Sequence, residues 1–360
     1  MWVFLLNKIY YICIMNEILN EYFEKGLLHK QVHPTLDLTI WNYSEKVQYE
    51  SLWDKITLMC RGLVTNSNGD IVGRPFKKFF NMEEGRCETT NAFEVYDKLD
   101  GSLGILFNYN GQWIICTRGS FTSDQAVEAT KMLDKYDIGI LPDRYTYLFE
   151  IIYPENRIVV DYNGHRGLVL LGAVITESGI EPSYGSLKDI AAMSNIPLVR
   201  IYNGITDYKE LKEMVRNDEE GFIVKFDNGE RMKVKGAEYI RLHKLMTNIS
   251  TTVIWEHVKD GFEVLLLLED VPDEFYKKIQ SYVKELNWQY GSIRNRVGKI
   301  FDYHMYGKYG DKEPVTNKKE YAEWVMTQEA VFRPILFNMF DGKDYSKHIW
   351  KLIKPKYEKL

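Results

Sequence analysis

Apolar and polar residues alternate over much of the first 240 positions of the chain, a pattern that predicts short β-strands. Asn110-Gly111 and Asn228-Gly229 each separate two such runs and predict tight hairpin turns. The runs that predict strands are 62–66, 71–74, 93–97, 103–108, 113–117, 147–153, 158–162, 168–174, 198–202, 219–226 and 231–235. Apolar residues three and four positions apart predict helices at 17–26, 124–133, 186–193 and 207–216.

Beyond about residue 240 the strand signals stop, and apolar residues recur at helical spacing to the end of the chain. The pattern therefore predicts a strand-rich first domain, residues 1–245, and a helical second domain, residues 246–360. Met15 precedes the first ordinary helix and could be the true start of translation. In that case residues 1–14 lie outside the fold.

Composition narrows the class of protein. The 360 residues carry a formal net charge of −5, and 45% of them are hydrophobic, enough for a substantial core. This charge excludes a general polycation, so any contact with nucleic acid must use local basic clusters. The four cysteines and seven histidines show no zinc-site or disulfide-scaffold spacing, which favours a reducing cytoplasm. No stretch reaches the roughly 18 apolar residues of a membrane span.

Lys98-Leu99-Asp100-Gly101 lies where one predicted strand ends and the next begins. One interpretation is an exposed turn, because Asp-Gly is common in turns and lysine is usually exposed. The other is a lysine nucleophile that attacks the α-phosphate of a nucleotide. A lysine attacks only as the neutral amine, which at the usual pKa of about 10.4 is roughly one part in a few thousand at pH 7. Neighbouring cations, for which Lys233, Lys235 and a magnesium ion are candidates, favour the neutral form.

Cationic residues at four other places could bind phosphate. They are Arg61 beside Gly62, Lys78 within the aromatic segment 74–81, Arg118 beside Gly119, and the pair Lys233 and Lys235. The two lysines of the pair alternate along one predicted strand and so face the same side. Taken alone, each feature is also typical of a strand or turn with basic residues on its exposed face.

Two carboxylates, Glu150 and Glu220, lie in or beside strands that are otherwise apolar. An unpaired carboxylate in such a place is costly. Each is therefore expected to meet a cation, a ribose hydroxyl or a metal ion.

In this order and spacing, the motifs from about Asn42 to Tyr239 resemble those of the ATP-dependent RNA ligase 1 family. These are the bacteriophage T4-type ligases of tRNA repair, within the covalent nucleotidyltransferase superfamily. The matching segments are Cys60-Arg61-Gly62, 74–81, 98–102, 149–159, Glu220-Gly221 and 233–235 with Tyr239. The resemblance implies an α+β fold, with an adenylyltransferase domain of antiparallel sheets and flanking helices followed by a mostly α-helical C-terminal domain.

The resemblance also implies roles. Lys98 would carry AMP, and ATP with Mg²⁺, or Mn²⁺ in its place, would be the cofactors. The residues that would bind the nucleotide are Arg61, Lys78, Asp100, Gly101, Arg118, Glu150, Glu220, Lys233, Lys235 and Tyr239, with Glu150 and Glu220 also holding the metal ion. The partner would be RNA with 5′-phosphate and 3′-OH ends, of which nicked tRNA is one candidate. A separate end-healing kinase-phosphatase could supply those ends to a ligase that we expect to be a monomer.

Alternatives stay open at this point. A DNA ligase or an mRNA guanylyltransferase shares the lysine motif, but usually appends a five-stranded OB-fold after the paired-lysine strand, where this chain has helices. A non-catalytic RNA-binding relative would keep the fold and lose the reaction. The basic tail 347–359 could follow an RNA backbone or be an exposed helix face.

Overall fold

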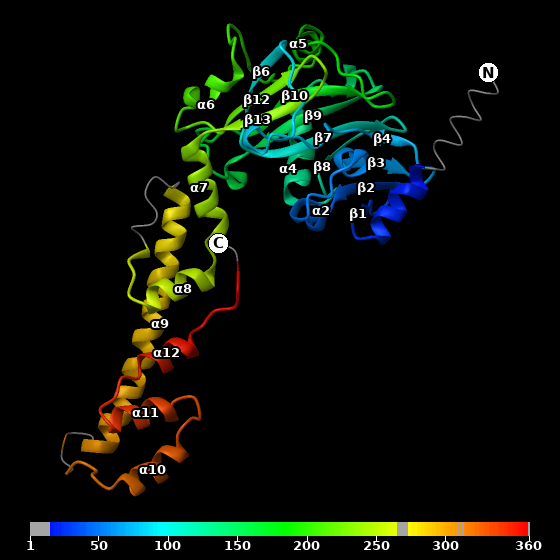
Figure 1. Cartoon of the computed structure of the whole chain (residues 1–360). Helices are drawn as coiled ribbons and strands as arrows, with labels where there is room; N and C mark the ends of the chain where they lie inside the picture. The colour runs from blue at the N-terminus through cyan, green and yellow to red at the C-terminus, as the bar shows by residue number, and fades with distance from the viewer. Residues whose placement is uncertain (1–14, 265–272, 308–309, 311–312, 359–360) are drawn as a thin grey trace. The chain divides into compact units, whose positions relative to one another are not determined.

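The computed structural model describes residues 15–264, 273–307, 310 and 313–358, and the chain divides between Ile240 and Arg241 into two compact units. The expectation for residues 1–14 lies outside the described residues. The assignment of residues 1–245 to an adenylyltransferase domain and of residues 246–360 to a helical C-terminal domain stays a prediction. Each unit is described by itself below (Figure 1).

The described residues of the first unit contain three β-sheets. Their orders are β1-β2-β3-β4, then β10-β9-β7-β8, then β11-β6-β12-β13-β5. Neighbouring strands pair antiparallel, except that β13 pairs parallel with β5. The strands are β1 (Leu28–Val32), β2 (Leu38–Tyr43), β3 (Arg61–Asn66), β4 (Ile71–Gly73), β5 (Phe80–Asn81), β6 (Phe93–Lys98), β7 (Ser102–Tyr109), β8 (Gln112–Thr117), β9 (Tyr145–Ile152), β10 (Gly167–Ile175), β11 (Ile201–Tyr202), β12 (Gly221–Phe226) and β13 (Arg231–Lys235).

Helices flank these sheets, and their starts follow local capping chemistry. Ser123 accepts a hydrogen bond from the backbone N–H of Ala126, and Ser183 does the same for Ser186. The α-helices of this unit are residues 15–24, α2 (Glu45–Tyr49), α3 (Lys55–Met59), α4 (Asp124–Met132), α5 (Tyr184–Met193) and α6 (Leu211–Met214). Its 3₁₀ helices are η1 (Met82–Glu84), η2 (Leu133–Lys135), η3 (Ile138–Ile140), η4 (Pro154–Asn156) and η5 (Tyr208–Glu210).

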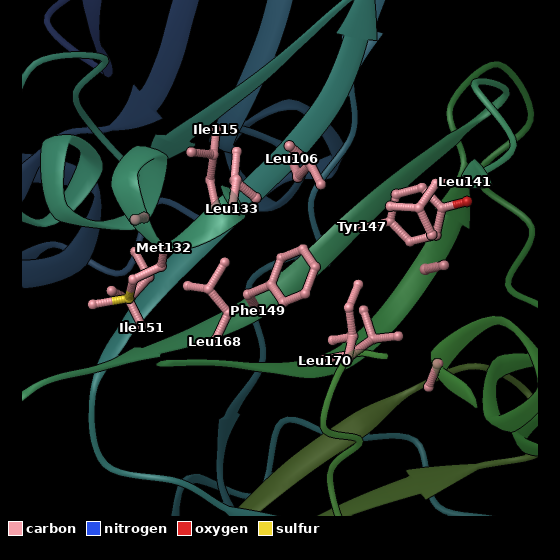
Figure 2. Packing of buried hydrophobic residues seen from close by; sticks show 14 of the residues in the cluster. Leu106, Ile115, Met132, Leu133, Leu141, Tyr147, Phe149, Ile151, Leu168 and Leu170 are labelled. Atoms are coloured by element: carbon pink, nitrogen blue, oxygen red, sulfur yellow. The ribbon is translucent and has the colours of Figure 1, made fainter. Parts of the chain in front are cut away.

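The second sheet is buried on both faces. On one face, Ile40 and Val64 of the first sheet pack with Ile105 and Phe107 of β7. On the other face lies a larger cluster, in which residues of α4 and α5 pack with residues of β7, β8, β9 and β10. Figure 2 shows Phe149 of β9 in this cluster. The strands that lead to the candidate site are therefore anchored in a close-packed core.

The second unit is helical in its described residues. Its helices are α7 (Ala237–Asn248), which begins in the first unit, α8 (Thr251–Lys259), α9 (Asp273–Tyr306), α10 (Lys318–Thr327), α11 (Arg333–Phe340) and α12 (Ser346–Leu352). Tyr321 is fully buried in its core, where its hydroxyl donates to the carbonyl of Leu336 at 2.8 Å. Within the described residues, no helix is both long and apolar enough to span a bilayer.

The predicted fold class, antiparallel sheets with flanking helices and a mostly helical C-terminal part, is confirmed. The prediction of a strand at 158–162 is wrong, because the backbone N–H groups of Val159 and Val160 donate to the carboxylate of Asp100 instead of to a sheet. Two short helices, α2 and α3, were not predicted, and α5 begins at Tyr184 rather than Ser186.

Candidate functional site

Three neighbouring strands of the third sheet carry the candidate site. Val95, Phe222, Val224 and Val234 bury one face of β6, β12 and β13. Because alternate residues share a face, the residues between them turn to the other side. The pairing register arranges these into three rows across the sheet, Lys98–Gly221–Lys235, Tyr96–Ile223–Lys233 and Glu94–Lys225–Arg231.

A cavity of about 220 Å³ lies over this face. Its lining brings together six predicted residues from four separate stretches of sequence. These are Arg61, Lys98, Gly101, Glu150, Lys233 and Lys235. Long-range strand pairing therefore brings four basic side chains and the carboxyl group of Glu150 around one space.

Lys98 forms an ion pair with Glu220, with 2.6 Å between Nζ and Oε2. The other carboxylate oxygen of Glu220 lies 2.8 Å from Nζ of Lys235. Glu220 is only 3% exposed, and a carboxylate this deeply buried is tolerated because both of its oxygens are paired. A cation partner was expected for Glu220, and one of its two partners is Lys98, the predicted nucleophile.

Gly221 explains how Glu220 reaches this position. The backbone φ of Gly221 is +142°, in a region that side chains disfavour. A Cβ atom there would lie 2.0 Å from the carbonyl oxygen of Val234. Glycine at this position therefore lets β12 begin directly against β13, which brings Glu220 within ion-pair distance of Lys98 and Lys235.

Asp100 is buried and has the contacts of a positioning residue. Its carboxylate accepts hydrogen bonds from the N–H groups of Val159 and Val160, at 2.8 and 2.9 Å, and from the hydroxyl of Tyr239 at 2.8 Å. Its own backbone N–H donates to the hydroxyl of Tyr162. Asp100 and Tyr239, both predicted to bind nucleotide, thus hold each other and the turn after Lys98.

Two groups of the cavity have shifted pKa values. Burial raises the pKa of Glu150 to about 8, although nearby Lys98 and Arg61 oppose this effect. Burial lowers the pKa of Lys233 to about 6, and the positive charges of Arg61, Lys78, Lys98 and Lys235 act in the same direction. These surroundings therefore favour the neutral amine of Lys233 at neutral pH.

Lys78 and Arg118, also predicted to bind nucleotide, meet at an aromatic residue that sequence reasoning missed. The hydroxyl of Tyr43 accepts a hydrogen bond from Nη1 of Arg118 at 3.2 Å. Nζ of Lys78 lies 5.6 Å from the centre of the Tyr43 ring and 5.4 Å from that of Trp53. Neither cation is among the residues that line the cavity.

Sequence analysis also did not identify the third row, Glu94–Lys225–Arg231, as part of the site. Lys225 and Arg231 line the cavity together with Glu181, which follows β10. The signal for Arg231 was available, since the alternation that pairs Lys233 with Lys235 extends back to it. Glu181 lies in a loop, where no periodicity marks it.

Residues 59–244, slightly more than half of the chain, match the model of the T4-type RNA ligase family. An RNA ligase of Rhodothermus phage RM378 is 24% identical over 346 residues, covering 74% of this chain and 76% of the phage protein. The "Putative bifunctional polynucleotide kinase/RNA ligase" of Autographa californica nuclear polyhedrosis virus is 27% identical over 245 residues, covering 58% of this chain. This chain spans about a third of that relative, since the match covers 34% of the viral protein.

Among solved structures, an archaeal ATP-dependent RNA ligase superposes with a TM-score of 0.49 at 12% sequence identity. The superposition covers 91% of this chain and 96% of the archaeal chain.

Proposed function

Because the chain belongs to the T4-type RNA ligase family, we propose that it is an ATP-dependent RNA ligase that joins an RNA 3′-OH to an RNA 5′-phosphate. The observation that carries the proposal is the position of Lys98. This lysine shares one cavity with Arg61, Lys233 and Lys235, and is paired with Glu220. Such a concentration of cations suits a triphosphate, and a lysine amine among them suits attack on it.

In the first step, Nζ of Lys98 attacks the α-phosphorus of ATP. A P–N bond forms, the bond to the β-phosphate oxygen breaks, and pyrophosphate leaves with the bonding electrons. Before the attack, the ion-paired ammonium of Lys98 gives one proton to the carboxylate of Glu220, 2.6 Å away, and becomes the neutral amine. The amine loses a second proton to solvent as the P–N bond forms. Lys233, Lys235 and Arg61 neutralise the charge that develops on the phosphate oxygens.

In the second step, AMP moves from Lys98 to the 5′-phosphate of one RNA end, which breaks the P–N bond. In the third, the 3′-OH of the other end attacks that phosphate, a phosphodiester forms, and AMP leaves. Each step is a substitution at phosphorus, so positioning and charge neutralisation supply most of the catalysis.

The residues present fit a magnesium ion of the kind that takes most of its ligands from water and phosphate. Within the described residues, no group of three or more metal-ligating side chains exists, so the protein alone forms no metal cage. Glu150 lines the cavity and would contribute a carboxylate. Glu220 could contribute only after releasing Lys98 or Lys235. A bound magnesium ion would add positive charge at the phosphate oxygens.

The experiment that tests the proposal offers a 5′-phosphorylated, 3′-hydroxyl single-stranded RNA to the protein with ATP and magnesium. Wild type should join or circularise the RNA, and Lys98→Ala should not. Lys188→Ala is the matched control, because Lys188 is an exposed lysine on α5 outside the cavity, and this variant should keep full activity.

Nicked tRNA and nicked duplex DNA, offered in parallel, test the substrate. We propose RNA repair, with nicked tRNA as the first candidate, acting in the cytoplasm as a monomer. We also propose that a separate end-healing kinase-phosphatase prepares the ends for this chain. The viral relative, whose name joins a polynucleotide kinase to an RNA ligase, supports a link between ligation and end healing. Preferential sealing of the DNA nick would overturn the RNA assignment. If GTP labelled at its α-phosphate labels the protein and ATP labelled in the same way does not, the chain would instead be a guanylyltransferase.

A further inference from the structure

The third row of the sheet face lies at a distance from Lys98 that suits a nucleoside. Glu94 is four residues before Lys98 on β6, which at 3.3 Å per residue is about 13 Å along the strand. This is comparable to the span of a nucleoside monophosphate from its phosphorus to the far edge of its base. Lys225 and Arg231 of this row line the same cavity as Lys98.

The walls between Lys98 and the third row are suited to a flat apolar ring. The rings of Tyr96 and Tyr184 lie 5.8 Å apart, and Ile223 of β12 lies beside Tyr96 in the second row. Phe76 lines the cavity as well, with the guanidinium of Arg231 lying 4.2 Å from its ring centre. Aromatic and aliphatic walls with a few polar groups at one end are typical of nucleobase pockets.

Glu181 is a polar group at this end of the pocket, and its contacts with two basic residues fix the position of its carboxylate. Nη1 of Arg231 donates to its Oε1 at 2.8 Å, Nη2 donates to its Oε2, and Nζ of Lys225 lies 3.3 Å from Oε2. Burial acts to raise the pKa of Glu181, but Arg231 and Lys225 outweigh it and hold that pKa below its ordinary value. The end of the pocket therefore presents an ionised carboxylate, and its Oε1, which accepts one hydrogen bond from Arg231, keeps a lone pair that can accept another.

We propose that Glu181 reads the six position of the purine and selects ATP over GTP. Adenine carries an amine at this position, which can donate to the carboxylate. Guanine carries a carbonyl oxygen, which would face the carboxylate without a donor between them. This inference rests on the proposed function, because it assumes that the base lies toward the third row when the α-phosphate lies at Lys98.

The test measures equilibrium binding of ATP, GTP and inosine triphosphate to the full chain in EDTA, so that no step beyond binding contributes. Inosine shares the six-carbonyl of guanine but lacks its two-amino group. Wild type should bind ATP at least about 10-fold more tightly than either of the other two nucleotides. Glu181→Gln keeps the shape and offers an amide N–H to the carbonyl, and should reduce this preference about 10-fold or more. Asp189→Asn, which removes an exposed carboxylate on α5, should leave the preference unchanged.

Wild type that binds inosine triphosphate as tightly as ATP would show that the six position is not read, even if Glu181→Gln fails to fold. An unchanged preference in folded Glu181→Gln would also overturn the inference, as would a wild-type chain that binds none of the three nucleotides. The first two outcomes would leave the proposed function standing, whereas a chain that binds no nucleotide would refute both. A chain that selects ATP but never joins RNA would refute the ligase assignment and leave this inference intact.

Discussion

Binding of ATP in the absence of metal should take up about one proton at pH 8, and Lys233 should be the group that takes it up. Burial lowers the pKa of Lys233 to about 6, and the charges of Arg61, Lys78, Lys98 and Lys235 add to the effect. The phosphates of ATP reverse that environment, because a nearby negative charge favours the ammonium form.

The expected number of protons follows from the pKa of Lys233. At pH 8, two units above a pKa of about 6, only about 1% of Lys233 carries its charge. If bound ATP restores the ordinary value of 10.5, nearly all of it becomes charged, which is about one proton per site. Glu150, with a pKa of about 8, is about half ionised at this pH and could add up to about half a proton.

Isothermal titration calorimetry in two buffers with different ionisation enthalpies measures this number directly, with EDTA present to exclude metal. Lys233→Met should take up about one proton less than wild type. Lys188→Met, the exposed control, should match wild type. Tight binding of ATP with no proton uptake in wild type, or the same uptake in Lys233→Met, would refute the reasoning about this lysine.

Three further predictions concern stability. Gly221→Ala should lower the free energy of unfolding, measured in a denaturant titration, by about 3 kcal/mol or more, and should abolish RNA joining. The reason is that the new Cβ would lie 2.0 Å from a carbonyl oxygen. The control Gly185→Ala, in which no atom lies closer than 3.8 Å to the new Cβ, should have neither effect. Asp100→Ala should lower the same free energy by about 2–4 kcal/mol, because it leaves two backbone N–H groups without their acceptor; a loss below about 0.5 kcal/mol would contradict this. Because the pKa of Lys233 is lowered in the folded chain, the unfolded chain binds more protons than the folded chain between about pH 6 and 10.5, so this lysine makes the free energy of unfolding rise with pH in that range. Denaturant unfolding curves of Lys233→Met, measured across this range, should lose that rise.

The local structure around Lys98 was predictable because it depends on local signals. The alternation of 93–97 and 103–108 predicts two strands, and β6 and β7 lie there. Asn110 and Gly111 both have positive φ, as their sequence predicts for a tight hairpin turn.

Which distant segments come together to form the site was harder to predict from the sequence. Nothing in local periodicity says that residue 98 pairs with residue 221, and only the family resemblance brought Glu220 into the same site as Lys98. The resemblance also assigned Glu220 to nucleoside and metal binding, whereas in this structure both of its oxygens are engaged by lysines.

Tertiary contacts overrode the pattern elsewhere. The β-branched run 158–160 is typical of a strand, but two of its N–H groups serve the buried carboxylate of Asp100. Glu181 reaches the cavity from a loop, and its partners Lys225 and Arg231 are far along the chain. Such contacts depend on the packed sheets and leave no trace in residue spacing.

The most direct test of the central claim is the covalent labelling of Lys98. The protein is incubated with ATP labelled at the α-phosphate and with magnesium, without RNA, and the labelled peptide is identified by mass spectrometry. We predict one AMP per chain, attached to the peptide that contains Lys98, and no label in Lys98→Ala. Label that is absent from wild type, or that persists at another residue in Lys98→Ala, would contradict the account.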